Sequence, residues 1–216
     1  MAVEFAKRMK VRLTLTEEML GTASGDPELY ATYIASKAPD ADKREQEIED
    51  FDPDAQFDKA MTGFPRDENG QPFVYDYQIR GFFKEAASFL RKLPNSASKD
   101  LKAFKKQIDG LIMVEPRKIP LNFKGFPGQC QRPLRASTPP GERIALAVSE
   151  SVPVGTTLEF DICMFDAKDE ERVREWLDYG KYHGLGQWRS SGKGSYLWEE
   201  LDENGKAIGG NYAENK

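Results

Sequence analysis

Residues 157–179, TLEFDICMFDAKDEERVREWLDY, contain a strand and a helix in direct succession and decide the fold class. In the first nine residues apolar side chains alternate with polar ones such as Glu159 and Asp161, a period of two that predicts a strand with one buried face. The following segment, 169–179, places its apolar residues on one helical face and precedes Gly180, a residue type that often ends helices. The pair predicts a sheet with a helix packed on it.

The flanking sequence extends this pattern in both directions. Apolar periodicity predicts a helix over 78–93, ended by Pro94, and a second helix over 99–108. Alternating or short apolar runs predict further strands at 10–15, 110–114, 144–148 and 195–198. Helices that separate such strands predict an α+β fold with helices on an antiparallel sheet, and a ferredoxin-like core with insertions is the simplest such architecture.

The length of 216 residues fits a single domain, 1–216, with two excursions from the core. The first is a polar insertion at about 22–72, with weak helical content around 28–34 and 43–51. The second is a proline-rich stretch at about 115–143, whose proline density excludes regular helix and central strand and favours an extended hairpin. The polar tail from Asp202 onward is expected to fray.

Charge is unevenly distributed along a chain of net charge −5. Residues 61–150 carry 15 basic and 9 acidic side chains, whereas the segments on both sides are acidic. A polarised molecule of this kind can present a basic face to a polyanion, or stack its acidic end on the basic face of another copy. Ordinary solvated surface is the alternative.

The cysteines and the single histidine provide no metal-ligand pattern. Cys130, Cys163 and His183 are far apart in the sequence, so we expect no metal and no cofactor. No apolar run is long enough to span a bilayer, and the N-terminus lacks the apolar core of a signal peptide. We therefore expect a cytoplasmic protein without a membrane partner.

The glycine-rich segment 184–196, GLGQWRSSGKGSY, is the strongest candidate binding element. Glycine permits positive φ and close approach of the backbone to a ligand, and basic side chains add charge beside it. The residues expected to contribute are Gly184, Gly186, Gly192 and Gly194, together with Arg189 and Lys193. A hairpin turn without a ligand is the alternative.

Basic residues also follow the helix predicted over 78–93. Arg80, Lys84 and Arg91 lie close enough in helical angle to form one stripe. The stripe is a candidate phosphate-binding surface, and simple solubilisation of the helix is the alternative.

Four segments resemble the RAMP superfamily of CRISPR-associated proteins, and within it the backbone subunits that coat guide RNA. Segment 11–21 resembles the family's opening strand and its glycine exit, and 152–160 its turn into a late strand. Segment 70–84 lies where the family has a Pro-Gly-Ser-Ser-Leu-Lys-Gly motif entering its first helix, although 75–78 reads Tyr-Asp-Tyr-Gln. Segment 184–196 matches the C-terminal glycine-rich loop.

The resemblance implies a ferredoxin-like fold of the RNA-recognition-motif type and a non-catalytic protein that binds single-stranded nucleic acid, expected to be guide RNA. Copies of the chain and other effector subunits would pack beside it along the strand. Arg80 and Lys84 fall where the family keeps basic residues, and with Arg189 and Lys193 they would contact phosphates. Trp188 or Tyr77 would stack on a base.

The resemblance leaves three other functions open. Some relatives cut RNA with a metal-bound aspartate, for which Asp58 is the nearest candidate here. Relatives that process guide RNA use a histidine, which makes His183 a candidate general base. A phage-encoded protein that mimics a subunit and interferes with a CRISPR complex would have the same sequence features.

Overall fold

The computed structural model describes residues 5–24, 61–138 and 141–212, with the backbone alone for 134–145. Its strands and helices, in chain order, are β1 (Lys7–Leu15), β2 (Met19–Leu20), β3 (Ala23–Ser24), β4 (Met61–Gly63), β5 (Phe73–Tyr75), α3 (Asp76–Leu90), α4 (Phe104–Leu111), β6 (Ile112–Glu115), β7 (Lys118–Pro120), β8 (Gly128–Thr138), β9 (Gly141–Val152), β10 (Thr157–Met164), α5 (Asp169–Tyr179), β11 (Tyr196–Leu201) and β12 (Ala207–Gly210).

The main sheet has the strand order β12-β11-β1-β10-β6, and every neighbouring pair is antiparallel. Helix α3 connects β1 to β6, and α5 connects β10 to β11. Strand β10 lies between β1 and β6, so the first strand–helix–strand unit is split by a later strand. This arrangement is the ferredoxin-like topology, and the predicted α+β class is confirmed.

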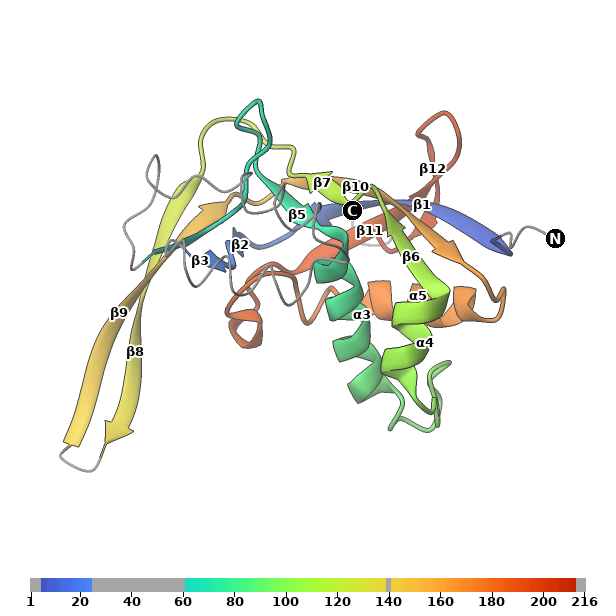
Figure 1. The fold of residues 1–216 in the computed structure, drawn as a ribbon, viewed down its shortest axis with the longest axis horizontal. Helices are drawn as coiled ribbons and strands as arrows, with labels where there is room; N and C mark the ends of the chain where they lie inside the picture. The colour runs from blue at the N-terminus through green and yellow to red at the C-terminus, as the bar shows by residue number, and fades with distance from the viewer. Residues whose placement is uncertain (1–4, 25–60, 139–140, 213–216) are drawn as a thin grey trace, which may run out of the picture.

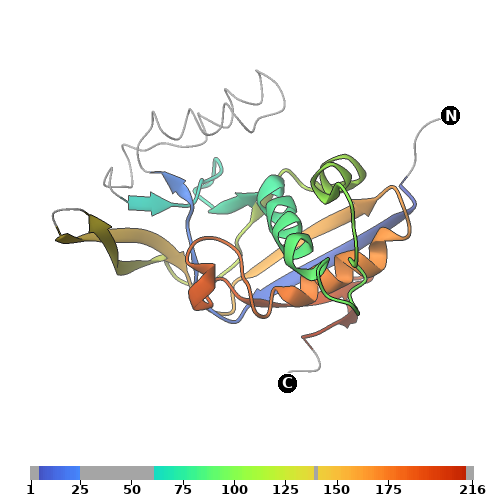
Figure 2. The same cartoon turned by 90° about the horizontal axis from the view of Figure 1, so that it is seen from below.

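The core lies between this sheet and the helices that cover one of its faces (Figure 2). Along β1, Met9, Val11 and Leu13 are buried and alternate with exposed or half-buried polar residues. Helices α3 and α5 contribute large buried rings such as Phe83 and Trp176, whose centroids are 5.6 Å apart. Burying a side chain of this size contributes about 1.5–3 kcal/mol, so this contact stabilises the packing of α3 against α5.

A second sheet carries the long arm visible in Figure 1. Its order is β2-β9-β4-β3, and β8 pairs with β9 from Gly128↔Ser151 to Thr138↔Gly141. The hairpin begins inside the proline-rich stretch expected at 115–143 and extends beyond it to Val152. Pro133 fits there because, among the described strands, β8 pairs with β9 alone, and an edge strand tolerates a residue without an N–H.

Several predicted boundaries were wrong. The second helix begins at Phe104, because Asp100 and Ala103 adopt left-handed backbone conformations that interrupt a helix begun at Lys99. The tail expected to fray contains β12, which pairs with β11. The predicted helical segments 28–34 and 43–51 lie outside the described residues.

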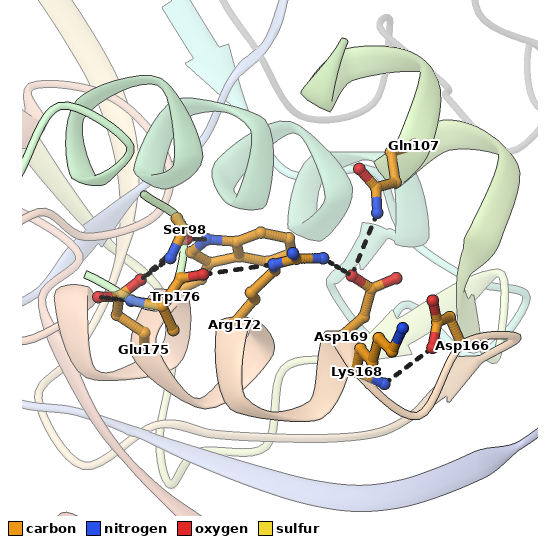
Figure 3. Close-up of polar contacts among 9 residues, drawn as sticks. Ser98, Gln107, Asp166, Lys168, Asp169, Arg172, Glu175 and Trp176 are labelled. Carbon is orange, nitrogen blue, oxygen red and sulfur yellow. Dashed lines mark hydrogen bonds and ion pairs between the residues drawn. The ribbon is translucent and has the colours of Figure 1, made fainter. Parts of the chain in front are cut away.

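A carboxylate on α5 holds the connection between α3 and α4 (Figure 3). Glu175 accepts hydrogen bonds from Ser96 Oγ at 2.8 Å, Ala97 N at 3.1 Å, and Ser98 N and Oγ at 3.2 and 2.8 Å. Ser98 Oγ in turn accepts from the indole Nε1 of Trp176 at 2.8 Å. One side chain therefore satisfies several polar groups of an irregular segment and ties it to the core.

Replacing Glu175 with glutamine is expected to lower the free energy of unfolding by about 1–3 kcal/mol, because one acceptor becomes a donor that faces other donors. Chemical denaturation measures the change. Glu171→Gln, on the exposed side of the same helix, is the matched control and should change stability by less than about 0.5 kcal/mol. Equal effects of the two substitutions would contradict the role assigned to Glu175.

Candidate nucleic-acid interface

The glycine-rich loop, 184–194, closes on itself through a contact between two glycines. A Cβ on Gly184 would overlap the backbone of Gly194, and a Cβ on Gly194 would overlap Leu185. Gly194 also has a φ of +71°, which side chains disfavour. Leu185 N donates to Gly194 O at 2.9 Å, and Gly194 N donates to Glu18 O at 2.9 Å, so the closed loop is fastened to the segment after β1.

The other two glycines of the loop have different surroundings. Gly186 lies against the backbone of Leu20 in β2, where a Cβ would overlap the Leu20 oxygen. Gly192 has a φ of +83° and no neighbour within 4 Å of a built Cβ, so turn geometry alone favours glycine there. Close packing therefore requires glycine at three of the four positions, 184, 186 and 194.

A pocket of about 260 Å³ lies between this loop, β2 and α3. Its floor is apolar, and helix α3 contributes a face that is open to it. Its buried lining includes Leu20, Ile79 and Phe82, and its partly exposed lining residues, which form the rim, include Gln78, Gly81, Glu85, Gly186 and Arg189. Helix α3 and the glycine-rich loop thus both border one hollow in the structure.

Arg189 is the cation at the rim of this pocket. Its guanidinium Nη1 forms an ion pair with Glu85 Oε2, and the other carboxylate oxygen of Glu85 lies 2.9 Å from His183 Nε2. The His183 ring also stacks on Tyr179, with centroids 5.5 Å apart. His183, which the sequence offered as a general base, is therefore engaged in packing and in a hydrogen bond to Glu85.

Lys193 lies on the part of the loop that faces the segment after β1. Its Nζ is 2.7 Å from Glu18 Oε1 and 4.0 Å from Glu17 Oε2. The hydrogen bond lowers the pKa of Glu18 and raises the pKa of Lys193, so both groups stay charged at neutral pH. The pair fixes the second basic side chain of the loop outside the pocket lining.

The predicted basic stripe of α3 faces away from the pocket. Arg80 pairs with Asp76 at 2.8 Å, and Lys84 pairs with Asp109 of α4 at 2.8 Å. Each helical residue advances by about 100°, so Lys84 and its neighbour Glu85 point in different directions. The structure does not bring Arg80 and Lys84 together with Arg189.

The two candidate stacking residues have different surroundings. Trp188 is in the glycine-rich loop and is 41% exposed. Tyr77 lies near the start of α3, where its ring stacks on Tyr75 with centroids 5.2 Å apart and the guanidinium of Arg117 lies 5.0 Å from its centroid. Trp188 precedes Arg189 and Tyr77 precedes Gln78, two residues that line the pocket, but Tyr77 is half-buried against Tyr75 and Arg117 whereas Trp188 is exposed.

The face of the main sheet opposite the helices carries ion pairs between side chains of neighbouring strands. Arg8, Lys10 and Arg12 of β1 project from it, opposite four carboxylates, those of Glu115, Glu159, Asp161 and Glu199. Arg12 Nε lies 2.7 Å from Glu159 Oε1, and Arg8 Nη2 lies 2.5 Å from Glu115 Oε2. Among the described residues of β1, β6, β10 and β11, none on this face is aromatic. The face therefore lacks both the excess positive charge and the rings that bind single strands.

Sequence reasoning missed Gln78 and Glu85 as parts of the site. Both lie on the face of α3 that includes Gly81, at the helical spacings i, i+3 and i+7, and this spacing was the available signal. The ion pair between Glu85 and Arg189 joins residues 104 positions apart, which no local pattern reveals.

No group of three or more histidine, cysteine, aspartate or glutamate side chains that could hold a metal ion occurs within 5–24, 61–138 and 141–212. Asp58, the candidate metal-binding aspartate, lies outside these ranges. Over the same part of the chain, no helix is both long and apolar enough to cross a membrane.

Comparisons with known proteins give likenesses to solved structures and no match in sequence. No family model matches the sequence, and no curated protein matches it. A chain from a cryo-EM structure of the type III-B Cmr-beta complex bound to cognate target RNA matches with a TM-score of 0.48 and 12% identity. The match covers 91% of this chain and 60% of that one, so the protein spans less than two thirds of the chain that it resembles. A likeness at this level assigns no function.

Gly184→Ala is expected to destabilise the protein by about 2–4 kcal/mol, because the added methyl group overlaps backbone that cannot move without opening the loop. Gly81→Ala is the matched control: no atom lies within 4 Å of its built Cβ, and alanine favours a helix by about 0.5–1 kcal/mol. Urea denaturation of both variants tests the contrast. A Gly184→Ala protein as stable as the parent would show that the loop is not closed in this way.

Proposed function

We propose that this protein binds single-stranded RNA, without cutting it, in the pocket between α3 and the glycine-rich loop. The observation that supports this most directly is the pocket rim itself. It combines the backbone of Gly186, the cationic side chain of Arg189 and the bare helical backbone at Gly81 around an apolar floor. Binding of single-stranded RNA requires these three properties: close approach of the RNA to the protein backbone, a cation for a phosphate, and an apolar surface for a base.

The face of the main sheet opposite the helices is a poorer candidate for RNA binding, which supports the pocket as the binding site. The acidic side chains of this face outnumber its basic ones, so it offers a phosphate no excess of positive charge. The surface beside Trp188 instead offers an exposed indole next to Arg189. Stacking of a base on such a ring contributes roughly 1–3 kcal/mol and tolerates any sequence.

The sequence resemblance extends the proposal to an assembly. As a backbone-type subunit of a CRISPR-like ribonucleoprotein, the protein would pack beside further copies along a guide RNA. Purification from an expressing bacterium, followed by size exclusion and sequencing of co-purifying nucleic acid, tests this. RNA of defined length in a large complex is expected, whereas a monomer that is free of nucleic acid and ignores added strands would contradict the proposal.

Arg189→Met is expected to weaken binding of a labelled oligo(U) RNA about three- to ten-fold and to reduce the slope of log K against log salt by about 0.7, the contribution of one phosphate contact. Fluorescence anisotropy at several salt concentrations measures both quantities. Lys84→Met removes the same unit charge from the side of α3 turned away from the pocket, so affinity should change by less than about two-fold. Equal losses in the two variants would place the strand elsewhere.

Glu85→Gln is expected to tighten RNA binding about two- to five-fold, because it removes a negative charge from the rim and releases Arg189 from its ion pair. Glu171→Gln, which removes an equal charge from an exposed position on α5, is the control. Unchanged or weaker binding by the Glu85 variant would show that the phosphate does not compete with this carboxylate.

A further inference from the structure

Trp188 has a backbone conformation that large side chains rarely adopt. Its φ and ψ are 56° and 35°, in the left-handed region, immediately before a 3₁₀ turn over Arg189–Ser191. Bulky residues in this region are outliers that persist only where the surrounding structure holds them. The conformation is therefore a constraint on where the indole lies.

A buried cation lies against that indole. The guanidinium carbon of Arg132, on β8, is 5.4 Å from the centroid of the Trp188 ring, within the range of a cation–π contact. Arg132 is only 9% exposed, although arginine is rarely this buried without an acidic partner. Its Nη1 has no hydrogen-bond partner among the described residues, so the burial of this group is not compensated there.

The guanidinium is held in place by Gln187. Arg132 Nη2 donates to Gln187 Oε1 at 2.6 Å. The amide nitrogen of Gln187 donates to Gly21 O at 2.9 Å and to Thr62 Oγ1 at 3.1 Å. Arg132 is thus fixed against elements at the base of the long hairpin, and the ring of Trp188 rests on a rigid support.

We propose that Arg132 is a positioning residue that presents Trp188 as a stacking site for a nucleobase of the bound strand. This inference rests on the proposed function. The guanidinium of Arg132 covers part of the Trp188 indole, and a base would stack on the exposed part. The indole would then lie between the guanidinium and the base. Because Arg189 follows Trp188 directly, the base on Trp188 would belong to a nucleotide adjacent to the one whose phosphate meets Arg189.

Intrinsic fluorescence can isolate this residue. Trp176 and Trp198 are 1% and 2% exposed, so acrylamide quenching of the emission reports mainly on Trp188. The experiment compares the parent protein with Arg132→Met, which keeps the length of the side chain, and Arg132→Lys, which keeps the charge. Arg91→Met removes a similar cation–ring contact, with Phe104, and is the matched control.

In the free protein, Arg132→Met is expected to change the quenching of Trp188, while Arg91→Met leaves it unchanged. On addition of a short oligo(A) RNA, the parent should lose emission and become protected from acrylamide, whereas the same strand with abasic sites should bind without this signature. Arg132→Met should lose most of the signature and about three-fold in affinity, and Arg132→Lys should restore part of both.

Two results would overturn the inference. If oligo(A) binds in an Arg189-dependent manner but Trp188 stays equally exposed to acrylamide, or Arg132→Met responds as the parent does, then Arg132 does not position a base-stacking residue and the proposed function stands. If the parent binds no single strand at all, the proposed function fails together with the nucleobase site, and the quenching of the free variants then reports a structural role alone.

Discussion

The contact between the backbones of Gly184 and Gly194 is the constraint on which the candidate site depends. It closes a loop whose ends follow α5 and enter β11, so the loop is anchored to the helix layer and to the sheet at once. With the ends joined and Gly186 packed against Leu20, Arg189 lies at the rim of the pocket beside α3. A closed loop of this kind loses little conformational entropy when a ligand binds, which favours affinity without any additional contact.

The ion pairs of the candidate cations bear on which surface can bind a phosphate. The four cations expected from the sequence each have an acidic partner: Arg80 with Asp76, Lys84 with Asp109, Arg189 with Glu85, and Lys193 with Glu18. The Arg189–Glu85 pair keeps about a third of each side chain in contact with solvent, and ion pairs near the surface contribute on the order of 1 kcal/mol, so a phosphate can replace this carboxylate at modest cost. What distinguishes Arg189 from the other three is its position at a concave, partly apolar surface.

The sequence predicted what depends on local periodicity. The alternation in β1 and β10 and the helical face of α5 can be predicted because each pattern depends only on residues that lie close together along the chain. The start of α4 was missed because Ala103, which directly precedes the helix, is not a residue type that favours the left-handed conformation. The pairing of Glu85 with Arg189, and of Arg132 with Trp188, depends on how β8, α3 and the loop meet in space, and no pattern within one segment contains that information.

Photo-crosslinking with a 4-thiouridine-substituted single-stranded RNA, followed by mass spectrometry of the linked peptides, tests the central claim most directly. Zero-length crosslinks report contact positions without any assumption about which side chains matter. The structure predicts crosslinks in the loop peptide that contains Trp188 and in the α3 peptide that contains Gly81, with none on the open face of β1. Crosslinks confined to β1 and β10, or none on the loop, would contradict the location of the site.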